Sequence, residues 1–517
     1  MATTNTQARI AALLALSALM NPAHAEWPTV ADAPLVVGPM QAFVGFAPSV
    51  VATAGEDLWV AWQDSICQGD LRVQRVNRAG LKLAPDGLAV QPDPTCGFVL
   101  PPALAPSGPD AVLSRAIAQL DATPLLRVSP DGAPAWGDGV LAEQALNMGG
   151  LLALAGGDTL VVARGFDFLR AFRLDPSGKP VWDSPTDIPS SVGANFEVLA
   201  MVTDGVDGAF VFWIAPSTYR RTIRVTRILS DGSLAWPDSI RPVPAPPLGG
   251  ASRHTDPVAL ADGVGGAFLL WTRGFEQVEI PTPLLMQRIG PDASLSFDIE
   301  GQRVSLANSR QFDPRARVDQ ATGDLLVAWR DGPFSAQTVS SQRLTADGDR
   351  LWGDNGVIIE PADSLTTFDA AWLASSPAVA VGRAAPASGD AAVLVHRLDG
   401  EGAPLAAPTP VSGDTPAAAI TLTQLGDGLG VVWRADAPGF DDLIVAQRLR
   451  ADGSLGGPGC TLADLAPPTG VLDLADLGAF VAAFIAGDPL ADLALPLAVL
   501  DLADAQAFVG SFVAGCP

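Results

Sequence analysis

GAFVFW at Gly208–Trp213 and RILSDG at Arg227–Gly232 form the two halves of one sequence unit. The first half is a short apolar segment rich in aromatic and β-branched residues, which is the composition of a buried strand. The second half ends in Asp-Gly, a pair typical of the tight turn between two antiparallel strands. Together they predict neighbouring strands of an antiparallel sheet, and both halves recur along most of the chain.

The Arg-containing half occurs eight times, and successive arginines are 46 to 61 residues apart. The eight copies are RVNRAG at Arg75, RVSPDG at Arg127, RLDPSG at Arg173, RILSDG at Arg227, RIGPDA at Arg288, RLTADG at Arg343, RLDGEG at Arg397 and RLRADG at Arg448. The apolar half reads DLWVAW at Asp57, DTLVVAR at Asp158, GAFVFW at Gly208, GAFLLW at Gly266, DLLVAW at Asp324 and GLGVVW at Gly428. Several copies are followed by a Trp-Gly or Gly-Val step, as in AWGDGVL at Ala135 and LWGDNGVII at Leu351. Each period therefore contains about four short strands separated by Gly-containing turns.

Four strands in a repeat of about 50 residues are typical of one blade of a β-propeller. We therefore predict a mainly β fold, with a β-propeller of eight four-stranded blades over residues 26–457. Seven blades is the alternative, because the second and seventh copies depart most from the pattern. The segment Pro34–Val37 resembles the strand that the last copy lacks, so we expect it to complete the final blade and close the ring.

The recurring arginines and tryptophans have a structural interpretation. A residue that occupies the same place in every blade is better suited to packing between blades than to eight copies of an active site. The guanidinium fork can bind a carboxylate and backbone carbonyls together. We therefore expect the repeat arginines to connect neighbouring sheets.

Residues 1–25 have the features of a secretory signal peptide: one charge at Arg9, an apolar run from Ile10 to Met20, and small residues at Ala23 and Ala25. The apolar run is too short to cross a bilayer. The sequence therefore predicts a protein that is exported through this signal peptide and is secreted or held at the cell surface.

The chain is strongly acidic, with 31 Lys and Arg residues against 56 Asp and Glu residues and a net charge of −25. A surface of this charge repels phosphate backbones, so nucleic acid is excluded as a partner class. The four cysteines are Cys67, Cys96, Cys460 and Cys516. Their even number in an exported chain favours disulfides, with Cys67–Cys96 and Cys460–Cys516 as the local pairs. Free buried thiols are the alternative.

Residues suited to catalysis are few. His254 lies in a polar segment, His396 lies inside a predicted strand, and Tyr219 is the only tyrosine of the chain. The sequence has no HExxH, Cys-X-X-Cys or Gly-X-Ser-X-Gly motif and no phosphate-binding glycine loop. We assign no catalytic residue, and a non-enzymatic function is favoured.

The C-terminal residues 458–517 form a separate duplicated unit, joined to the repeats by the Gly-rich stretch 453–459, which we expect to be a flexible linker. Alignment of Leu462–Pro489 with Leu490–Pro517 gives 19 identities in 28 positions. Leu477, Phe480, Val481 and Phe484 follow helical spacing, which predicts one buried apolar stripe on a helix in each copy. The two helices would pack against each other through these stripes.

The run before each predicted helix resembles a degenerate calcium loop of the EF-hand type, in which oxygen ligands occupy fixed positions. The candidate ligands are Asp464, Asp473 and Asp476 in the first copy and Asp492, Asp501 and Asp504 in the second. Three carboxylates in each loop could hold a weakly bound calcium ion. A proline-stiffened loop without metal is the alternative, since Ala466 and Pro468 occupy two ligand positions and Ala498 replaces the turn glycine.

Two half-repeats with VLDLAD followed by AFV, ending in Gly-Cys-Pro, resemble the GC-type dockerin anchors at the C-termini of exported planctomycete proteins. The resemblance covers Cys460–Pro517, about a ninth of the chain. It implies a docking module for a cohesin-like or other surface protein. Such anchors are attached to unrelated proteins, so the resemblance implies nothing about the propeller.

Three functions are consistent with this organisation. The first is an exported, anchored propeller that binds a protein or a glycan, and this is the one that the scarcity of catalytic groups favours. The second is a carbohydrate-active enzyme, a polysaccharide hydrolase or lyase, with a dockerin anchor. The third is a structural protein of the envelope or matrix.

Overall fold

The computed structural model describes most of the chain, and the account below concerns those residues. They are 27–41, 47–64, 70–91, 102–114, 122–137, 139–143, 147–164, 169–188, 197–217, 220–244, 252–275, 281–333, 336–360, 365–383, 386, 389–436, 441–457, 461–466 and 471–515. The predicted signal peptide and all four cysteines lie outside these ranges, so both disulfide assignments remain predictions.

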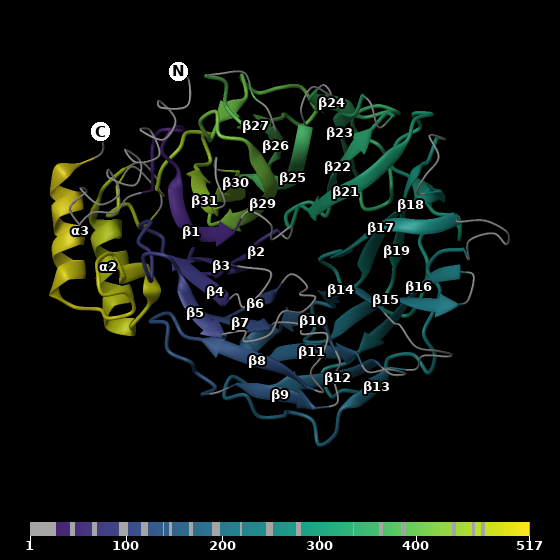
Figure 1. Ribbon diagram of the computed structural model, residues 1–517, viewed down its shortest axis with the longest axis horizontal. Helices are drawn as coiled ribbons and strands as arrows, with labels where there is room; N and C mark the ends of the chain where they lie inside the picture. Colours follow the sequence, from purple (N-terminus) through teal and green to yellow (C-terminus); the bar gives the residue numbers. More distant parts are fainter. Residues whose placement is uncertain are drawn as a thin grey trace.

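Eight antiparallel sheets stand around a central axis and form a β-propeller, which confirms the predicted fold class (Figure 1). Blades 1 to 8 follow chain order, and the first strand of each lies innermost, beside the first strand of the next blade.

Blade 1 consists of β2 (Ser49–Ala52), β3 (Leu58–Gln63), β4 (Leu71–Val76) and β5 (Leu88–Gln91). Blade 2 consists of β6 (Ala103–Ser107), β7 (Asp110–Ser114), β8 (Ala122–Val128) and β9 (Val140–Glu143). Blade 3 consists of β10 (Asn147–Ala153), β11 (Thr159–Arg164), β12 (Leu169–Leu174) and β13 (Thr186–Ile188), with the short 3₁₀ turn η1 (Ala155–Gly157) before β11.

The remaining blades follow the same order. Blade 4 consists of β14 (Glu197–Thr203), β15 (Ala209–Ser217) and β16 (Arg220–Ile228). Blade 5 consists of β17 (Ser252–Ala261), β18 (Ala267–Phe275), β19 (Leu284–Ile289) and β20 (Gln302–Arg303). Blade 6 consists of β21 (Gln311–Val318), β22 (Leu325–Asp331), β23 (Thr338–Leu344) and β24 (Val357–Glu360). Blade 7 consists of β25 (Leu365–Leu373), β26 (Ser376–Arg383), β27 (Val393–Arg397) and β28 (Thr409–Pro410), and blade 8 of β29 (Ala417–Leu425), β30 (Gly428–Ala435), β31 (Asp441–Leu449) and β1 (Leu35–Gln41).

The sheet count confirms eight blades, and the alternative of seven is wrong. Among the described residues seven sheets have four strands, and blade 4 has three. In blade 4 a single bridge between Val225 and Ile240 stands where the other blades place their fourth strand. The second and seventh copies, which looked weakest in sequence, each form a complete sheet.

The N-terminal strand closes the ring, as predicted. Strand β1 pairs antiparallel with β31, from Leu35 opposite Ala446 to Gln41 opposite Asp441. The last blade is therefore assembled from both ends of the propeller sequence. This arrangement covers the sheet edge that β31 would otherwise expose.

Neighbouring blades face each other through apolar side chains, so the core is a series of layers between sheets. The central strands are apolar on both faces, as in β3, because each face is covered by another blade. The second strands contribute tryptophans that are fully buried in these layers: Trp59, Trp62, Trp213, Trp271, Trp329 and Trp433. This explains why the second strands read as continuous apolar runs instead of alternating with polar residues.

As their recurrence suggested, repeat arginines connect neighbouring blades: a hydrogen bond to a backbone carbonyl of the next blade is donated by Arg75, Arg127, Arg173 and Arg227. In blade 2, Arg127 Nε lies 2.6 Å from Asp110 Oδ2, and Arg127 Nη1 donates over 2.9 Å to the carbonyl of Pro176 in blade 3. The indole of Trp136 donates to the same carbonyl over 3.0 Å. The ion pair within the blade recurs as Arg75–Asp57, Arg173–Asp158, Arg227–Asp204, Arg288–Asp262 and Arg343–Asp324.

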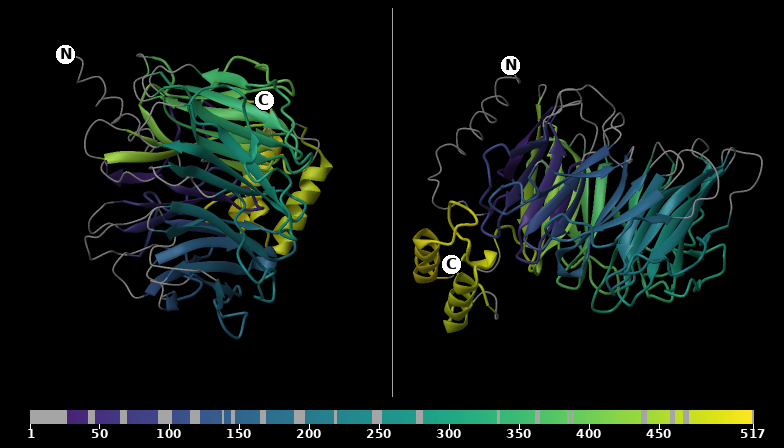
Figure 2. Two further views of the ribbon diagram at one scale, coloured as in Figure 1. Left: turned by 90° about the vertical axis from the view of Figure 1, so that its right-hand side faces the viewer. Right: turned by 90° about the horizontal axis from the view of Figure 1, so that it is seen from below.

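The C-terminal unit contains helix α2 (Leu474–Ala486), the 3₁₀ turn η2 (Pro489–Ala491) and helix α3 (Leu502–Ala514). It lies against the outside of the propeller beside blade 1 (Figure 2). The part of the expected linker from Gly453 to Gly457 is instead part of blade 8. Leu455 bridges to Leu449, and Gly456 N–H donates to the carbonyl of Arg448, because this stretch repeats the turn that follows every copy of the arginine motif.

Candidate functional site

The two helices of the C-terminal unit begin in the same way. Asp473 and Asp501 are the N-caps of α2 and α3, and each accepts a 2.6 Å hydrogen bond from the second amide of its helix. Three residues on, Asp476 and Asp504 complete a capping box by accepting the N-cap amide over 2.8 and 2.9 Å. The Asp-X-X-Asp pattern within VLDLAD therefore starts each helix.

Asp476 and Asp504 also hold the chain that precedes each helix. Oδ1 of Asp476 accepts the amides of Leu465 and Ala466 over 2.7 and 2.8 Å. Oδ1 of Asp504 accepts the amides of Leu493 and Ala494 over the same two distances. Each buried carboxylate thus binds three backbone amides, and a carboxylate so bound has both oxygens occupied.

Four of the six predicted calcium ligands therefore accept hydrogen bonds from backbone amides of the protein itself, namely Asp473, Asp476, Asp501 and Asp504. Among the described residues no group of three or more His, Cys, Asp or Glu side chains is placed to hold a metal ion. The first loop, with Asp464, includes residues 467–470, which lie outside the described ranges, so calcium there remains a prediction. In the second loop, Asp492 Oδ2 lies 3.1 Å from Nη2 of Arg75 in blade 1, so a cationic side chain already occupies one side of it. Calcium in the second loop likewise remains a prediction, and Arg75 is a cation that already lies beside one of its predicted ligands.

The helices expose apolar side chains on one outward face each. In α2, Leu474 and Ile485 are both 80% exposed, and in α3 the equivalent residues Leu502 and Val513 are 70% and 79% exposed. Val481 and its equivalent Val509 lie between them and are also exposed. We call these six residues the helical face; because its two halves are equivalent by the duplication, it is a repeated apolar surface.

This arrangement corrects the predicted buried stripe. Phe480 and Phe508 do face each other and stack with ring centroids 4.3 Å apart. Leu477 and Val481, however, point away from the core and are largely exposed. The inward positions beside the phenylalanines are taken by Ala483 and by the capping Asp476, which the spacing of apolar residues alone could not reveal.

The charge around the helical face is acidic. Residues 461–515 contain no Lys, Arg or His, and their ionisable side chains are all aspartates. Asp464, Asp476, Asp492 and Asp504 are buried, whereas Asp473, Asp488 and Asp501 lie nearer the surface. A protein that binds this face would therefore meet an apolar surface with acidic edges.

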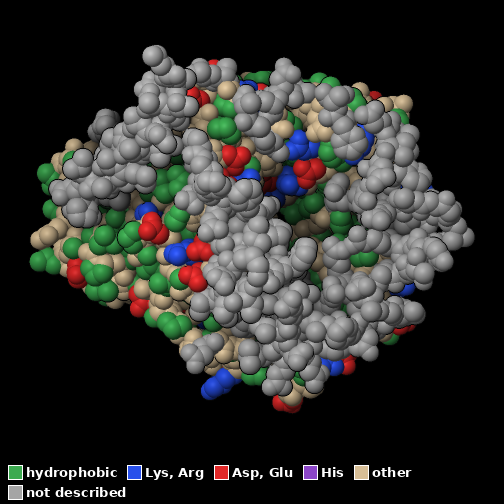
Figure 3. All heavy atoms as spheres, viewed as in Figure 1, with side chains coloured by type: hydrophobic (Ala, Val, Ile, Leu, Met, Phe, Trp, Pro, Cys, Tyr) green, Lys and Arg blue, Asp and Glu red, His purple; other side chains and the backbone are tan. Residues whose placement is uncertain are grey.

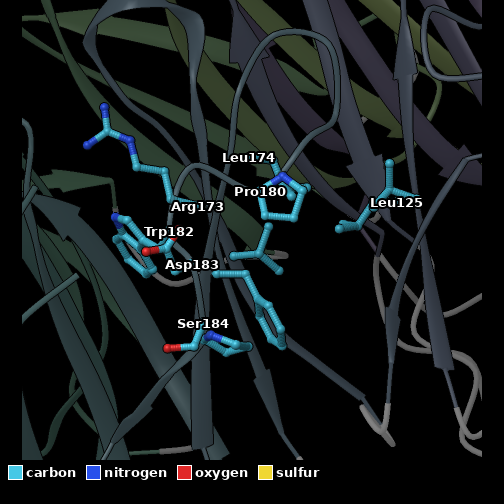
Figure 4. Close-up of a pocket in the computed structure, with 11 residues that line it drawn as sticks. Leu125, Arg173, Leu174, Pro180, Trp182, Asp183 and Ser184 are labelled. Carbon is cyan, nitrogen blue, oxygen red and sulfur yellow. The ribbon is translucent and has the colours of Figure 1, made fainter. Parts of the chain in front are cut away.

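The propeller has a pocket between blades 2 and 3, with a volume of about 240 Å³ (Figure 4). Its walls are mainly apolar, with Phe172, Trp182 and Pro180 among them. Its one basic residue, Arg173, is bound to Asp158 and Asp207. The pocket could thus accommodate a small apolar group, but its basic residue is already paired with aspartates.

Among the described side chains of the inner strands, several charged groups near the propeller axis form ion pairs. Arg317 in β21 lies 3.2 Å from Asp369 in β25, whose Oδ2 also accepts the amide of Leu422 over 2.8 Å. Arg315 lies 2.6 Å from Asp313 on the same strand. On the face shown in Figure 3, acidic and basic side chains of the described residues lie beside one another around the central hollow.

Of the residues considered for catalysis, His396 is the one whose side chain the structure describes. His396 in β27 lies 3.3 Å from Glu360, which also binds Arg383, and burial lowers the pKa of His396. His254 lies in β17, in another blade, and its side chain is outside the described part. Tyr219 is also outside it. His396 is thus part of a contact between blades 6 and 7, consistent with its structural interpretation.

Sequence reasoning missed the residues of blade 1 that contact the C-terminal unit. Four of them belong to the first copy of the arginine motif and the last follows it directly: Arg75, Asn77, Arg78, Ala79 and Leu81. A signal was available, since RVNRAG has Ala79 at its fifth position, where five of the other seven copies have Asp. The departure from the repeat marks the attachment point.

The fold and these sites define an eight-bladed β-propeller with an appended helical pair. No family model matches the chain, and no curated protein matches it. Among solved structures it is similar to the Dos1 propeller, with 9% identity, a TM-score of 0.43 and coverage of 80% of this chain and 95% of that one. It is also similar to the β-propeller domain of the Trilobed protease from Pyrococcus furiosus, with 11% identity, a TM-score of 0.39 and coverage of 72% and 97%. A puromycin hydrolase mutant gives 18% identity and a TM-score of 0.40 over 68% of this chain, and the match spans 52% of that chain.

In the described part of the chain no helix is both long and apolar enough to span a membrane.

Proposed function

We propose that this chain is an exported, non-enzymatic β-propeller that binds a protein or glycan and is retained on a partner protein through the helical face. The observation that carries the proposal is the repeated exposure of equivalent apolar residues on α2 and α3. Single exposed apolar residues on a surface need no explanation. Here, however, both members of each equivalent pair are exposed: Leu474 and Leu502, Val481 and Val509, and Ile485 and Val513. A cohesin-like or other surface protein with an apolar patch edged by basic groups has the complementary chemistry.

The non-enzymatic part is supported by how the described charged groups are used. Most of the repeat arginines pair with aspartates of their own blades, and near the axis Arg317 pairs with Asp369 of the next blade. A glycosidase needs two carboxyl groups on either side of the scissile bond. The propeller's own ligand is then a protein or glycan that binds without being cleaved.

The test for retention uses the mature full-length protein and a set of purified cohesin-like domains as probes in surface plasmon resonance. Leu474→Asp combined with Leu502→Asp should weaken binding at least about tenfold, since it places two charges within an apolar contact. Val264→Asp is the control, because Val264 is 75% exposed on the propeller. Equal binding by the wild type and the double variant would contradict the proposal.

The test for the propeller uses a panel of polysaccharides, with binding and release of reducing ends measured together. Binding without release supports the proposed function. Release of reducing ends would instead establish the carbohydrate-active enzyme.

A further inference from the structure

We propose that Arg75 of blade 1 is the resident cation of the second loop of the C-terminal unit, residues 492–504. In this arrangement a guanidinium from the propeller does the work that a metal ion does in a calcium loop. It also fixes the unit to the propeller in one orientation. The inference does not depend on the proposed function.

The first support is the way in which Arg75 differs from the other repeat arginines. Its Nε lies 2.8 Å from Asp57 and its Nη1 donates over 3.2 Å to the carbonyl of Pro130, as expected for the blade-to-blade connection. Its remaining nitrogen, Nη2, binds Asp492 over 3.1 Å. Arg227, in contrast, donates hydrogen bonds from both Nε and Nη2 to Asp204 of its own blade. Arg75 is therefore the repeat arginine that joins the propeller to the second loop.

The second support is burial. The side chain of Arg75 is 0% exposed, and those of Asp57 and Asp492 are 1% exposed. A buried carboxylate needs a compensating charge, because removal of an ion from water is costly. Here the compensating charge at Asp492 comes from the same chain.

The third support is the loop itself. Asp492 Oδ2 also accepts the amide of Ala498 over 2.9 Å. Ala498 has φ of 62°, a left-handed conformation that is unfavourable for alanine. The first copy has a glycine, Gly470, at the equivalent position of the sequence. The hydrogen bond to Asp492 holds this turn closed. The pair of Arg75 and Asp492 therefore organises the loop where a metal ion would otherwise bring its ends together.

The fourth support is the surrounding contact. Asn77 Nδ2 donates over 2.7 Å to the carbonyl of Asp492, and Arg78 Nη2 donates over 3.0 Å to the carbonyl of Asp464, the equivalent residue of the first copy. Ala79 and Leu81 pack against Leu462 and Leu497 in one buried cluster. Both copies of the duplicated unit are thus bound, at the equivalent residues Asp464 and Asp492, by one short segment of blade 1.

A divalent ion at Asp492 would conflict with this arrangement. It would lie within a few ångströms of the guanidinium, in a region where charge repulsion is weakly screened. It would also find Asp504 already bound to three backbone amides. The second loop therefore has its cation and does not require calcium.

The test measures amide hydrogen exchange over residues 492–504 in the mature full-length protein, with calcium and with a chelator. The wild type should show equal protection in both. Arg75→Gln should raise exchange in this segment at least about tenfold in both conditions, because it removes the charge and the bond to Asp492. Arg127→Gln is the matched control: it changes the same repeat position one blade further on and should leave the segment unchanged.

A second variant covers the case in which Arg75→Gln disturbs folding. Asp492→Asn keeps the shape of the side chain and lowers its charge, so it should raise exchange in the same segment while the propeller strands remain protected. Loss of protection in the wild type on chelation would overturn the proposal. So would wild-type protection in both the Arg75→Gln and the Asp492→Asn variants.

Discussion

The indole of Trp27 donates a 3.0 Å hydrogen bond to the carbonyl oxygen of Arg78, which joins the N-terminal segment to the turn of blade 1. Four junctions between consecutive blades have the same bond, from Trp136 to Pro176, from Trp182 to Ser230, from Trp236 to Pro291 and from Trp352 to Gly400. In each the tryptophan lies nine residues after a repeat arginine and the acceptor lies three residues after the next one. Blade 8 has Gly457 at the tryptophan position, so the N-terminal segment supplies Trp27 there.

Trp27→Phe should therefore loosen the closure of the ring. The substitution leaves the carbonyl of Arg78 without this donor in a buried setting, and we expect a loss of about 1–3 kcal/mol in the free energy of unfolding. Amide exchange in β1 should also increase, because the segment that follows Trp27 leads directly into that strand. Trp182→Phe removes the same bond at an internal junction and should leave β1 unchanged. Unchanged exchange of β1 in the Trp27 variant would show that the strand pairing alone closes the ring.

Tryptophans of the second strands explain the glycine that comes directly before the fourth strand in blades 1 and 5. Gly301 has φ of 81°, and a Cβ atom there would lie 2.4 Å from Cη2 of Trp271. Gly87 stands in the same relation to Trp62, with φ of 77° and the same 2.4 Å distance. The glycine is needed because the indole of its own blade lies against its backbone.

Gly301→Ala should lower the free energy of unfolding by about 3 kcal/mol, from the clash with Trp271 and the left-handed backbone together. Gly323→Ala is the control, because Gly323 has φ of 77° but no atom within 4 Å of the added Cβ. It should lose only about 1 kcal/mol. Chemical denaturation of both variants separates the two contributions, and equal losses would contradict the role given to Trp271.

Much of the propeller was predictable because its signals are local and repeated. The apolar halves, the Asp-Gly turns and the near-constant spacing each specify a strand or turn, and eight copies made the period visible. The closing strand could be predicted because the last copy lacked one. The absence of a complete fourth strand in blade 4 was not predictable, since nothing in its arginine motif differs from the others.

The C-terminal unit was predictable only in part, for a different physical reason. The duplication and the helix caps are encoded locally, in Asp473 and Asp501 and their neighbours. The contact of Asp492 with Arg75 joins residues 417 positions apart, and a single sequence gives no measure of such a contact. The outward orientation of Val481 also depends on which face the partner helix covers, which helical spacing leaves open.

Buried ion pairs within blades should matter more than exposed ones. Asp204 accepts Nε and Nη2 of Arg227 over 2.9 and 2.8 Å, and its Oδ1 accepts the amides of Val206 and Gly208. Asp204→Ala should therefore lower the free energy of unfolding by about 3–5 kcal/mol, since it leaves Arg227 without its partner.

The control for that prediction is Asp187→Ala. Asp187 lies 2.6 Å from Arg170, but its side chain is 68% exposed. A surface pair of this kind contributes at most about 1 kcal/mol. Denaturation curves for the two variants should therefore differ clearly, and similar losses would show that the repeated Arg–Asp pairs add little to the stability of the blades.

The same buried cluster that holds the C-terminal unit should make stability depend on pH. Burial raises the pKa of Asp57 from 3.8 to about 6, against the opposing effect of Arg75 and with the support of the nearby Asp492. Between these two values the folded protein binds a proton that the unfolded chain does not. The free energy of unfolding should therefore fall as the pH rises from about 4 to about 6, by about 3 kcal/mol, and level off above that range.

Asp57→Asn is the variant that isolates this effect. Asparagine can still accept a hydrogen bond from Arg75 but does not titrate, so the slope between about pH 4 and pH 6 should become much smaller. Asp492, whose pKa burial also raises, accounts for the remaining slope of the same sign. The aspartates with lowered pKa values, such as Asp175 and Asp231, act in the opposite direction and below this range, because their hydrogen bonds with neighbouring serines favour the ionised form. Denaturation of the wild type and the variant across this range measures both slopes, and equal slopes would remove Asp57 as their source.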